Sequence, residues 1–361
     1  MRILFAIPGF HRYDRGAEVA LLAVAQVLAS GGDQITVMGS GPPRAGVAYA
    51  YRQVGSIARE RFEKFPKMPV LRSETAWEDA TFAAGLVASY RPADFDAAIT
   101  CSFPFTHWAL RKPSLETRPK QIFVTQNGDW PAFSDSAEYR TFRCDGLVCT
   151  NPDFAARNRE RWRVALIPNG ISPGNFAPRQ GDRAHFGLPK DRPVVLMVSA
   201  LIESKRVIEG IRAVGKLDGV HLAVAGDGAL RDSIKQAALT YLPGRFSNLT
   251  VKAEAMPALY NSADVFLHMS LLESFGNVFV EAAASGLPVV AHDTTRLRWI
   301  VGDDQPLCDT TDEASLIAAL RRALETGQRA APARIAEFHW PSIARQYRSF
   351  IAEVTGTEAS Q

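Results

Sequence analysis

Short apolar runs alternate with helical segments along nearly the whole of this 361-residue chain. In the first half the runs are ILFAI, ITVM, AAIT, QIFVT and GLVCT, at 3–7, 35–38, 97–100, 121–125 and 146–150. Helical segments lie between them, for example at 17–30 and 76–90. Strands that are apolar on both faces and alternate with helices are typical of a covered parallel sheet, so the sequence predicts a doubly wound α/β fold.

The second half of the chain repeats this alternation. Its apolar runs lie at 194–200, 220–226, 264–269 and 288–291, and its helical segments lie near 204–217, 229–241, 276–285 and 313–326. The stretch PNGISPGNFAPRQGD at 168–182 separates the halves and has the Pro, Gly and Asn content of an interdomain connection. A chain of this length with 47% hydrophobic residues exceeds what one core usually holds. We therefore predict two domains, at 1–170 and 171–338.

Charge and cysteine content exclude several classes of protein. The 41 basic and 38 acidic residues give a net charge of +3, too balanced for the basic field of a nucleic-acid-binding protein. The four cysteines have neither C-x-x-C nor zinc spacing, which favours buried thiols in a reducing compartment. The first apolar run is too short for a signal peptide, and no stretch approaches the ~20 apolar residues of a membrane helix. The sequence therefore predicts a cytoplasmic protein without a nucleic-acid partner.

Three loops that follow predicted strands have the composition of ligand sites, which in open α/β sheets lie beyond the carboxyl ends of the strands. Gly16, in RGAE, opens a helix whose first N–H groups are unpaired, although a plain strand–helix connection is the alternative. Lys205 and Arg206, in SALIESKRV, lie at the predicted start of a helix, where cations oppose the helix dipole unless an anion lies among them. A phosphate would remove this conflict, and an exposed basic pair is the alternative. The glycines of AGDGALR at 225–231 are interpreted as turn residues.

The stretch ESFGNVFVE, from Glu273 to Glu281, carries the strongest signal of a binding site. Glu273 lies in the predicted loop, and Phe275, Gly276 and Asn277 form the first turn of a helix, where free N–H groups suit a phosphate. Glu281 comes one turn later among apolar residues, where a carboxylate without donors would be costly. Ribose hydroxyls would supply donors, as they do for acidic residues in dinucleotide sites. A helix on which Glu281 faces solvent is the alternative.

These blocks together resemble a known enzyme family. The motif E-x₇-E in ESFGNVFVE, followed by EAAASGLPVVA, occurs with PNG at 168–170, SALIESKRV at 199–207, YNSADVFLHMS at 260–270 and RGAE at 15–18. Their order and separation resemble the retaining, nucleotide-sugar-dependent glycosyltransferases of family 4. The resemblance covers essentially the whole chain and is more specific in the second half than in the first.

The resemblance implies a GT-B fold, with two Rossmann-like doubly wound domains facing across a cleft. The N-terminal domain would bind the acceptor and the C-terminal domain the nucleotide-sugar donor. A C-terminal helix at about 340–356, in FHWPSIARQYRSFIAEV, would pack back on the first domain.

The resemblance also implies roles for individual residues. Lys205 would bind the donor diphosphate, Glu281 the ribose and Glu273 the hydroxyls of the transferred sugar. The N–H groups from Phe275 to Asn277 would contact phosphate or sugar. Gly16 would contact the phosphates from the opposite domain.

Two positions depart from the pattern of the family. Ser199 and Ala200 stand where the family usually has an Arg, so that Lys205 and Arg206 would carry the diphosphate. VTQNGDW stands where many members have a His near the reaction centre. Gln126 or Asn127 could take over this positioning role, or His107 could approach from the preceding loop. A packed loop histidine is the alternative for His107.

The predicted activity is transfer of a sugar from a nucleotide-diphosphate sugar to an acceptor hydroxyl by a hexosyltransferase type of enzyme. The expected mechanism is a front-face displacement without a metal or other cofactor, in which Lys205, Arg206 and a helix N-terminus would stabilise the charge on the leaving diphosphate. Two alternatives stay open: a GT-B sugar-nucleotide epimerase and a non-catalytic, glycosyltransferase-like partner subunit. A nicotinamide-dependent dehydrogenase is disfavoured because no G-x-G-x-x-G is present.

The acceptor is expected to be a carbohydrate, a lipid-linked sugar or a small molecule, in polysaccharide, glycolipid or glycoside biosynthesis. The stretch IARERFEKFPK at 57–67 mixes Phe and Ile with Arg and Lys, which suits either a solvated segment or peripheral contact with the inner face of a membrane. Nothing in the sequence specifies the nucleobase, the sugar, the acceptor, the linkage or the oligomeric state.

Overall fold

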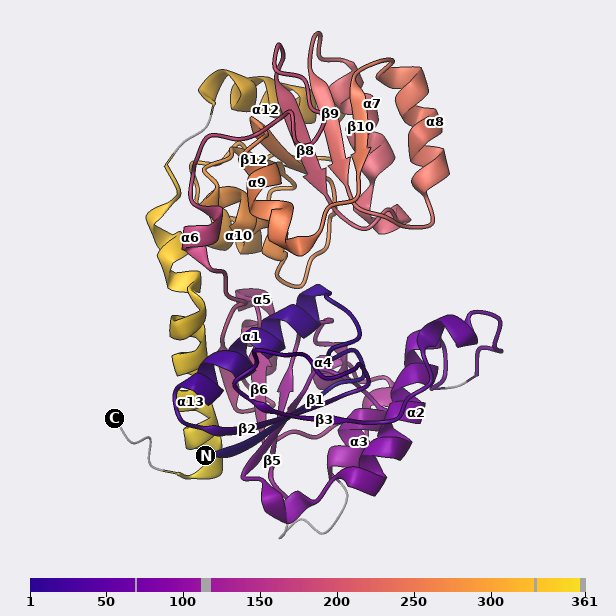
Figure 1. The fold of residues 1–361 in the computed structure, drawn as a ribbon, viewed down its shortest axis with the longest axis vertical. Helices are drawn as coiled ribbons and strands as arrows, with labels where there is room; N and C mark the ends of the chain where they lie inside the picture. Colours follow the sequence, from indigo (N-terminus) through magenta and orange to yellow (C-terminus); the bar gives the residue numbers. More distant parts are fainter. Residues whose placement is uncertain (69, 112–117, 328–329, 358–361) are drawn as a thin grey trace. The chain divides into compact units, whose positions relative to one another are not determined.

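The computed structural model describes residues 1–68, 70–111, 118–327 and 330–357, which form two compact units. Unit 1 comprises Met1–Gly170 and the chain from Trp340 onward, and unit 2 is Ile171–His339 (Figure 1). Each unit is built on one parallel sheet, so the predicted fold class of two doubly wound α/β domains is confirmed. No helix of the described residues is long and apolar enough to cross a bilayer.

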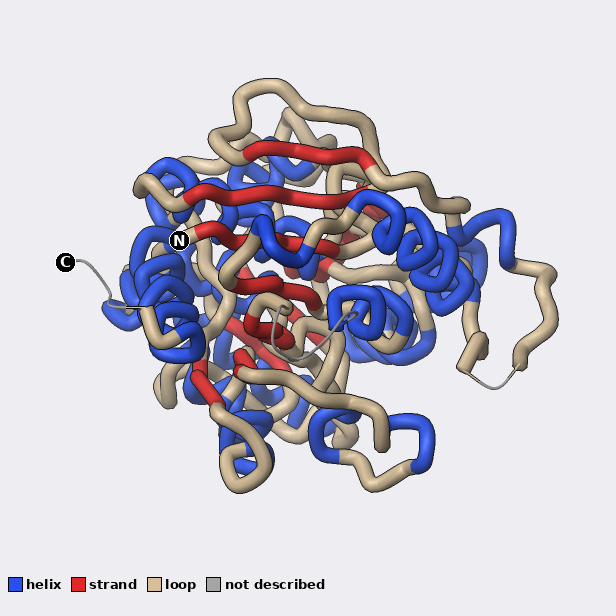
Figure 2. The backbone as a smooth tube through the Cα atoms, turned by 90° about the horizontal axis from the view of Figure 1, so that it is seen from below, coloured by secondary structure: helices blue, strands red, loops and turns tan. Residues whose placement is uncertain are grey.

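Unit 1 has a seven-stranded sheet in the order β3-β2-β1-β4-β5-β6-β7, in which every pair is parallel. Its strands are β1 (Arg2–Ala6), β2 (Gln34–Gly39), β3 (Ala50–Gln53), β4 (Ala97–Thr100), β5 (Lys120–Val124), β6 (Gly146–Cys149) and β7 (Val164–Leu166). Its helices are α1 (Gly16–Ser30), α2 (Glu74–Ser89), α3 (Phe105–Arg111), α4 (Trp130–Phe133), α5 (Pro152–Asn158) and α13 (Trp340–Thr355). Figure 2 shows these strands as a twisted stack with helices on both sides.

The C-terminal helix α13 completes the core of unit 1. Its apolar side chains recur at helical spacing, and Ile343, Tyr347 and Ile351 are almost wholly buried. They lie in one hydrophobic cluster with Ile3 of β1 and Leu21 of α1. One face of the first sheet is therefore covered partly by residues more than 300 positions further along the chain.

Unit 2 has a five-stranded parallel sheet in the order β10-β9-β8-β11-β12. Its strands are β8 (Val194–Val198), β9 (His221–Ala225), β10 (Phe246–Leu249), β11 (Val265–His268) and β12 (Val289–Ala291). Its helices are α6 (Pro173–Phe176), α7 (Val207–Gly215), α8 (Arg231–Tyr241), α9 (Met256–Tyr260), α10 (Asn277–Ala284), α11 (Thr295–Val301) and α12 (Glu313–Thr326). Alternate residues of β8 belong to different cores: Val194 and Leu196 lie in one cluster and Val195 and Met197 in the other.

Two glycines of the AGDGALR turn allow the loops after β8 and β9 to approach each other closely. Gly226 and Gly228 have φ angles of 152° and 159°. A Cβ on Gly226 would lie 1.9 Å from the main-chain oxygen of Ser199, and one on Gly228 would lie 2.6 Å from that of Leu201. The loops after β8 and β9 therefore run in direct backbone contact, and this contact fixes the start of the segment that carries Lys205.

Candidate functional site in unit 2

The loop after β8 ends in a single 3₁₀ turn, Glu203–Lys205, which leads into α7. Lys205 therefore precedes the helix rather than opening it. Its ammonium group forms an ion pair with the Glu273 carboxylate, 68 positions away in the chain. Each of these side chains is 20% exposed, so the pair is partly shielded from water while still open to a ligand.

Arg206 differs from the prediction. It is the N-cap of α7, with a left-handed φ of 50°. Its guanidinium donates to the main-chain oxygens of Met269, at 3.3 Å, and Thr310, at 3.1 Å. The unfavourable placement of two cations beside a helix N-terminus is thus balanced within the protein: main-chain oxygens accept from Arg206, and the Glu273 carboxylate pairs with Lys205.

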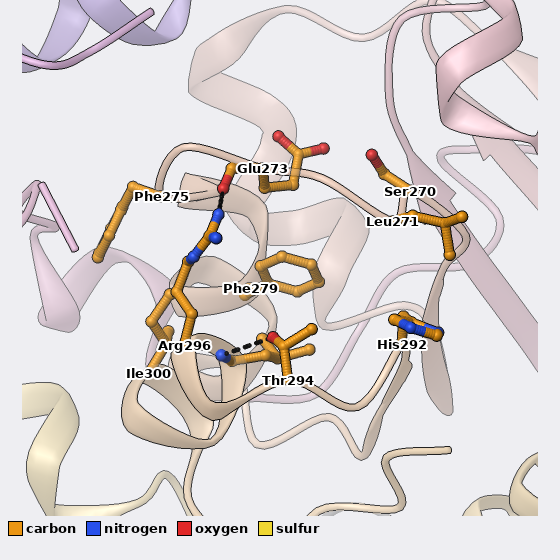
Figure 3. A pocket seen from close by; sticks show the side chains of 10 residues that line it. Ser270, Leu271, Glu273, Phe275, Phe279, His292, Thr294, Arg296 and Ile300 are labelled. Carbon is orange, nitrogen blue, oxygen red and sulfur yellow. Dashed lines mark hydrogen bonds between the residues drawn. The ribbon is translucent and has the colours of Figure 1, made fainter. Parts of the chain in front are cut away.

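Glu273 is held at both its main chain and its side chain. Its carboxylate accepts from Lys205, and the same oxygen, Oε1, lies 3.4 Å from Nε2 of His268. Its main-chain oxygen accepts from the guanidinium of Arg296 in α11 (Figure 3). The ESFGNVFVE loop is therefore tied to three other segments at its first residue.

His268, the last residue of β11, was not predicted from the sequence. It is 3% exposed, and its ring meets that of Phe279 edge-on at 4.8 Å between centroids. Burial lowers its pKa to about 4, although the nearby Glu273 carboxylate acts in the opposite direction. The ring is therefore neutral near pH 7. The available signal was a polar residue ending an apolar strand directly before the motif.

A pocket lies beside this group of residues. It encloses about 380 Å³, part of it open to solvent, and its lining includes Glu273, Phe275, Phe279, His292, Thr294 and Arg296 (Figure 3). Figure 3 shows the Phe279 ring among the polar side chains of Glu273, His292, Thr294 and Arg296. Among the described residues, no group of three or more His, Cys, Asp or Glu side chains is arranged as metal ligands.

The first turn of α10 begins directly after a glycine in the left-handed backbone conformation. Gly276 is the N-cap, with a φ of 82°, and as a glycine it has no side chain to cap the helix. A Cβ at this position would lie 2.6 Å from the Phe279 ring, so only glycine fits both the angle and the space. Phe275 is buried against Phe338, and Asn277 is the first helical residue. The predicted turn is thus present, close in sequence to Glu273.

Glu281 corrects one prediction. Its partners were expected to be ligand hydroxyls alone, but the Tyr260 hydroxyl donates to its Oε2 at 2.8 Å. Burial raises the pKa of Glu281, and the Tyr260 hydrogen bond offsets part of this shift. No hydrogen bond within the described residues reaches the second oxygen, Oε1. The protein therefore orients the carboxylate and leaves one oxygen for a further donor.

The predicted residues of unit 1 are less closely grouped. Gly16 is exposed and is the first residue of α1. Asn127 is exposed after β5, and its amide donates to the Cys101 sulfur at 4.0 Å. Its neighbour Gln126 exchanges two hydrogen bonds with Asn169 of the PNG stretch, at 2.5 and 3.0 Å. Two neutral amides therefore meet where β5 and β7 end.

The structure contradicts the hypothesis that His107 approaches a reaction centre. His107 has no exposed surface and stacks on Phe142, with ring centroids 4.9 Å apart. Gln121 donates to its Nδ1 at 3.2 Å, and burial lowers the pKa of the imidazole to about 3. The sequence could not distinguish this residue from a surface histidine, because the aromatic ring that covers it lies 35 residues later.

Comparison with known proteins gives a family match within unit 2. Residues 178–337 match the family described as Glycosyl transferases group 1. The lipopolysaccharide core biosynthesis glycosyltransferase LpsE of Rhizobium meliloti is 31% identical over 203 residues, covering 55% of this chain and 58% of that relative. The chain spans about half the length of the curated relatives that it matches.

Solved structures match the whole chain. Sucrose-phosphate synthase of Thermosynechococcus elongatus superposes with a TM-score of 0.78 at 20% identity, covering 99% of both chains. HepE of Anabaena, solved in complex with UDP and glucose, gives 0.74 at 17% identity and covers 98% of this chain and 100% of its own. At such identities these matches show the fold.

Proposed function

Because this chain belongs to the glycosyl transferases group 1 family, through residues 178–337, and has a GT-B fold, we propose that it is a retaining glycosyltransferase. It moves a sugar from a nucleotide-diphosphate sugar to an acceptor hydroxyl. The observation that carries this proposal is the Lys205–Glu273 pair beyond the carboxyl ends of β8 and β11. A cation suited to a diphosphate and a carboxylate suited to sugar hydroxyls lie side by side there.

Unit 2 is the proposed donor domain, with separate roles along one loop and helix. Lys205 binds the diphosphate, and Glu273 accepts from hydroxyls of the transferred sugar. The first-turn amides of α10, from Phe275 to Asn277, contact phosphate or sugar. Oε1 of Glu281 accepts from the ribose while Tyr260 holds Oε2, a division supported by the one side-chain hydrogen bond that this carboxylate accepts within the described part of the chain.

The proposed reaction is a front-face displacement. The acceptor oxygen attacks the anomeric carbon on the face from which the nucleotide leaves, and the electrons of the breaking C–O bond pass to the leaving diphosphate. That phosphate oxygen then takes the proton of the acceptor hydroxyl. Lys205 stabilises the negative charge that grows on the diphosphate, which lowers the barrier because the charge is larger in the transition state.

Unit 1 is the proposed acceptor domain. VTQNGDW stands where the family that the sequence resembles often has a histidine, and the exposed amide of Asn127 in this stretch can both donate to and accept from an acceptor hydroxyl. Gly16, exposed at the start of α1, keeps its predicted role as a phosphate contact. The name of the relative LpsE supports a sugar of a polysaccharide or glycolipid as the acceptor.

Two measurements test the activity. A thermal-shift screen against UDP, GDP, ADP, TDP and their sugars identifies the donor, since a ligand at 100 times its Kd adds about 2.7 kcal/mol of stability. The second measures release of the nucleoside diphosphate with and without acceptor sugars. Release that requires an acceptor supports a transferase, interconversion of the donor sugar without release indicates an epimerase, and binding without turnover indicates a non-catalytic subunit.

A chelator separates the proposed charge stabilisation from a metal-dependent one. Lys205 and the α10 amides supply the positive charge in this proposal, so we expect full activity in EDTA. Loss of activity in EDTA and its recovery with Mg²⁺ or Mn²⁺ would contradict this part of the mechanism.

We also propose that unit 1 contacts an anionic membrane surface through the loop 57–68. This loop extends beyond α2 (Figure 1). Ile57, Phe65 and Met68 are 45%, 49% and 41% exposed. The Phe65 ring packs edge-on against the Phe62 ring, with 5.0 Å between the ring centroids. Apolar side chains held outward in this way suit the boundary between headgroups and acyl chains.

Cations surround these apolar side chains. Arg61, Lys64 and Lys67 are exposed, and no ion pair within the described residues involves them. Each cation near an anionic surface contributes about 1 kcal/mol. We expect the chain to sediment with phosphatidylglycerol vesicles more than with phosphatidylcholine vesicles.

Matched variants test the loop itself. Phe65→Ser, or Lys64→Glu with Lys67→Glu, should reduce sedimentation with anionic vesicles. Leu239→Ser is the control, because Leu239 is 68% exposed on α8 of unit 2 and lies outside the proposed surface. Equal sedimentation of all variants would contradict the proposal.

A further inference from the structure

Oxygen Oε1 of Glu273 is contacted by two different side chains. Lys205 pairs with it directly, and Nε2 of His268 lies 3.4 Å away. A well-formed N–H···O bond measures about 2.7–3.2 Å, so the histidine contact is incomplete while Lys205 holds this oxygen. The same oxygen therefore has a second donor close by.

The orientation of His268 is fixed independently of Glu273. Its Nδ1 accepts the main-chain N–H of Ser270 at 3.3 Å. Because Nδ1 is then an acceptor, the proton of the neutral ring is on Nε2, the atom nearest Glu273. The edge-on contact with Phe279 limits rotation of the ring. The imidazole is thus a neutral donor that the fold holds ready for the Glu273 carboxylate.

The main chain and side chain of Glu273 are controlled separately. Arg296 holds its main-chain oxygen, which places Cα but leaves the carboxylate free to rotate. When a diphosphate attracts Lys205, the carboxylate loses its cation, and nothing in the Arg296 contact keeps it in place. A second donor is needed at that moment.

We infer that His268 is a positioning residue that takes over Oε1 of Glu273 when Lys205 turns to the donor diphosphate. Glu273 then keeps its other oxygen directed at the hydroxyls of the transferred sugar. This inference rests on the proposed function of the site and adds to it a residue that contacts neither diphosphate nor sugar. It predicts that His268 affects recognition of the sugar and not of the nucleotide.

Two substitutions divide the functions of the ring. His268→Gln places an amide donor near the position of Nε2 and loses the acceptor at Nδ1. His268→Asn keeps a group near Nδ1 for the Ser270 N–H and loses the donor toward Glu273. Both are polar and smaller than histidine, so a general loss of packing affects them alike.

The experiment is calorimetry with UDP and UDP-glucose, with GDP and GDP-mannose in parallel, together with donor kinetics. We expect both variants to bind the nucleoside diphosphate as the wild type does. His268→Asn should bind the nucleotide sugar, and turn it over, about 10- to 100-fold less well, whereas His268→Gln should recover most of this loss. The melting temperatures of the free variants check their folding.

The outcomes separate the role of His268 from the proposed function of the site. Equal behaviour of the Asn and Gln variants, or equal losses for diphosphate and nucleotide sugar, would overturn the role of His268 and leave the proposed function intact. A wild-type protein that binds none of the four probes, and none of the other nucleotides and nucleotide sugars of the thermal-shift screen, would count against the proposed donor site itself, and the inference would fall with it.

Discussion

The carboxyl ends of the two sheets carry different chemistry. In unit 2 the loops after β8 and β11 bring together opposite charges, Lys205 and Glu273. In unit 1 the segments after β5 and β7 bring together two neutral amides, Gln126 and Asn169. A charged pair suits a ligand that carries both phosphates and hydroxyls, whereas amides suit uncharged hydroxyls because each amide donates and accepts. This difference in charge agrees with the proposed roles of unit 2 as the donor domain and unit 1 as the acceptor domain.

Two adjacent cations sharpen this contrast within unit 2. Within the described residues, Lys205 pairs with the side chain of Glu273, while Arg206 is bonded to main-chain oxygens of two other segments. Under the proposed function the first residue binds a phosphate, whereas the second joins loops together.

The largest expected effect is that of Lys205→Ala. If charge grows on the leaving diphosphate, kcat should fall by about 10²–10³-fold and KM for the donor should rise. Arg206→Ala should lower the melting temperature more than Lys205→Ala does, and lower kcat less. Steady-state kinetics and thermal unfolding of both variants measure the contrast. Full turnover with unchanged nucleotide affinity in Lys205→Ala would assign both cations to structure.

The next effect concerns the second glutamate. Glu281→Ala should weaken nucleoside diphosphate binding by about 1.5–3 kcal/mol in calorimetry, the usual loss for a hydrogen bond to a charged group. Stability should also fall, because the buried Tyr260 hydroxyl loses its acceptor. Tyr260→Phe is the control, since it removes the same protein contact but keeps the carboxylate. An affinity loss as large in Tyr260→Phe would show that orientation, rather than the ligand contact, dominates.

A smaller effect is expected from unit 1. Asn127→Ala should raise KM for the acceptor by about 2- to 10-fold, the equivalent of one neutral hydrogen bond, while donor affinity stays unchanged. Acceptor and donor titrations, carried out separately, measure the two constants. A change in donor affinity with an unchanged KM for the acceptor would contradict the proposed assignment of acceptor binding to unit 1.

The smallest effect on activity is expected from His107→Phe, which keeps an aromatic ring on Phe142. Turnover near neutral pH should be unchanged, because the residue lies in the core. The folded-state pKa of about 3 lies below the ordinary value of 6.5, so the unfolded chain binds a proton in this interval that the native state does not. His107 therefore costs stability as pH falls from about 6.5 toward 3. Denaturant unfolding at about pH 7 and about pH 5 should show a smaller loss in the variant than in the wild type.

The central strands could be predicted from the sequence because burial on both faces demands continuous apolar runs. AAIT at 97–100 coincides with β4, and the predicted helix at 313–326 coincides with α12. Three edge strands, β3, β7 and β10, were not predicted. None of them is fully buried, and β3 and β10 have no continuous apolar run. Where only one neighbour pairs with a strand, its residues are less constrained by the core.

The site could be predicted only in part, because sequence patterns indicate which residues are special but not what they pair with. The E-x₇-E motif identified Glu273 and Glu281, yet the contacts with Lys205 and Tyr260 depend on loops brought together by the sheet. Arg206 shows the limit most directly: its left-handed φ turns the side chain toward Thr310, over 100 residues away, and no local pattern indicates this.

The position of α13 has a consequence for the order in which the chain is made. Unit 1 needs Ile343, Tyr347 and Ile351 to cover its sheet, but 169 residues separate Gly170 from Trp340. At about 5–20 residues per second, a ribosome needs roughly 8–34 s to supply the missing helix. Unit 2 is continuous in sequence and is complete before that helix emerges. We therefore expect unit 2 to reach its native state first. Until α13 is made, the face of the first sheet that α13 covers keeps part of its apolar surface exposed.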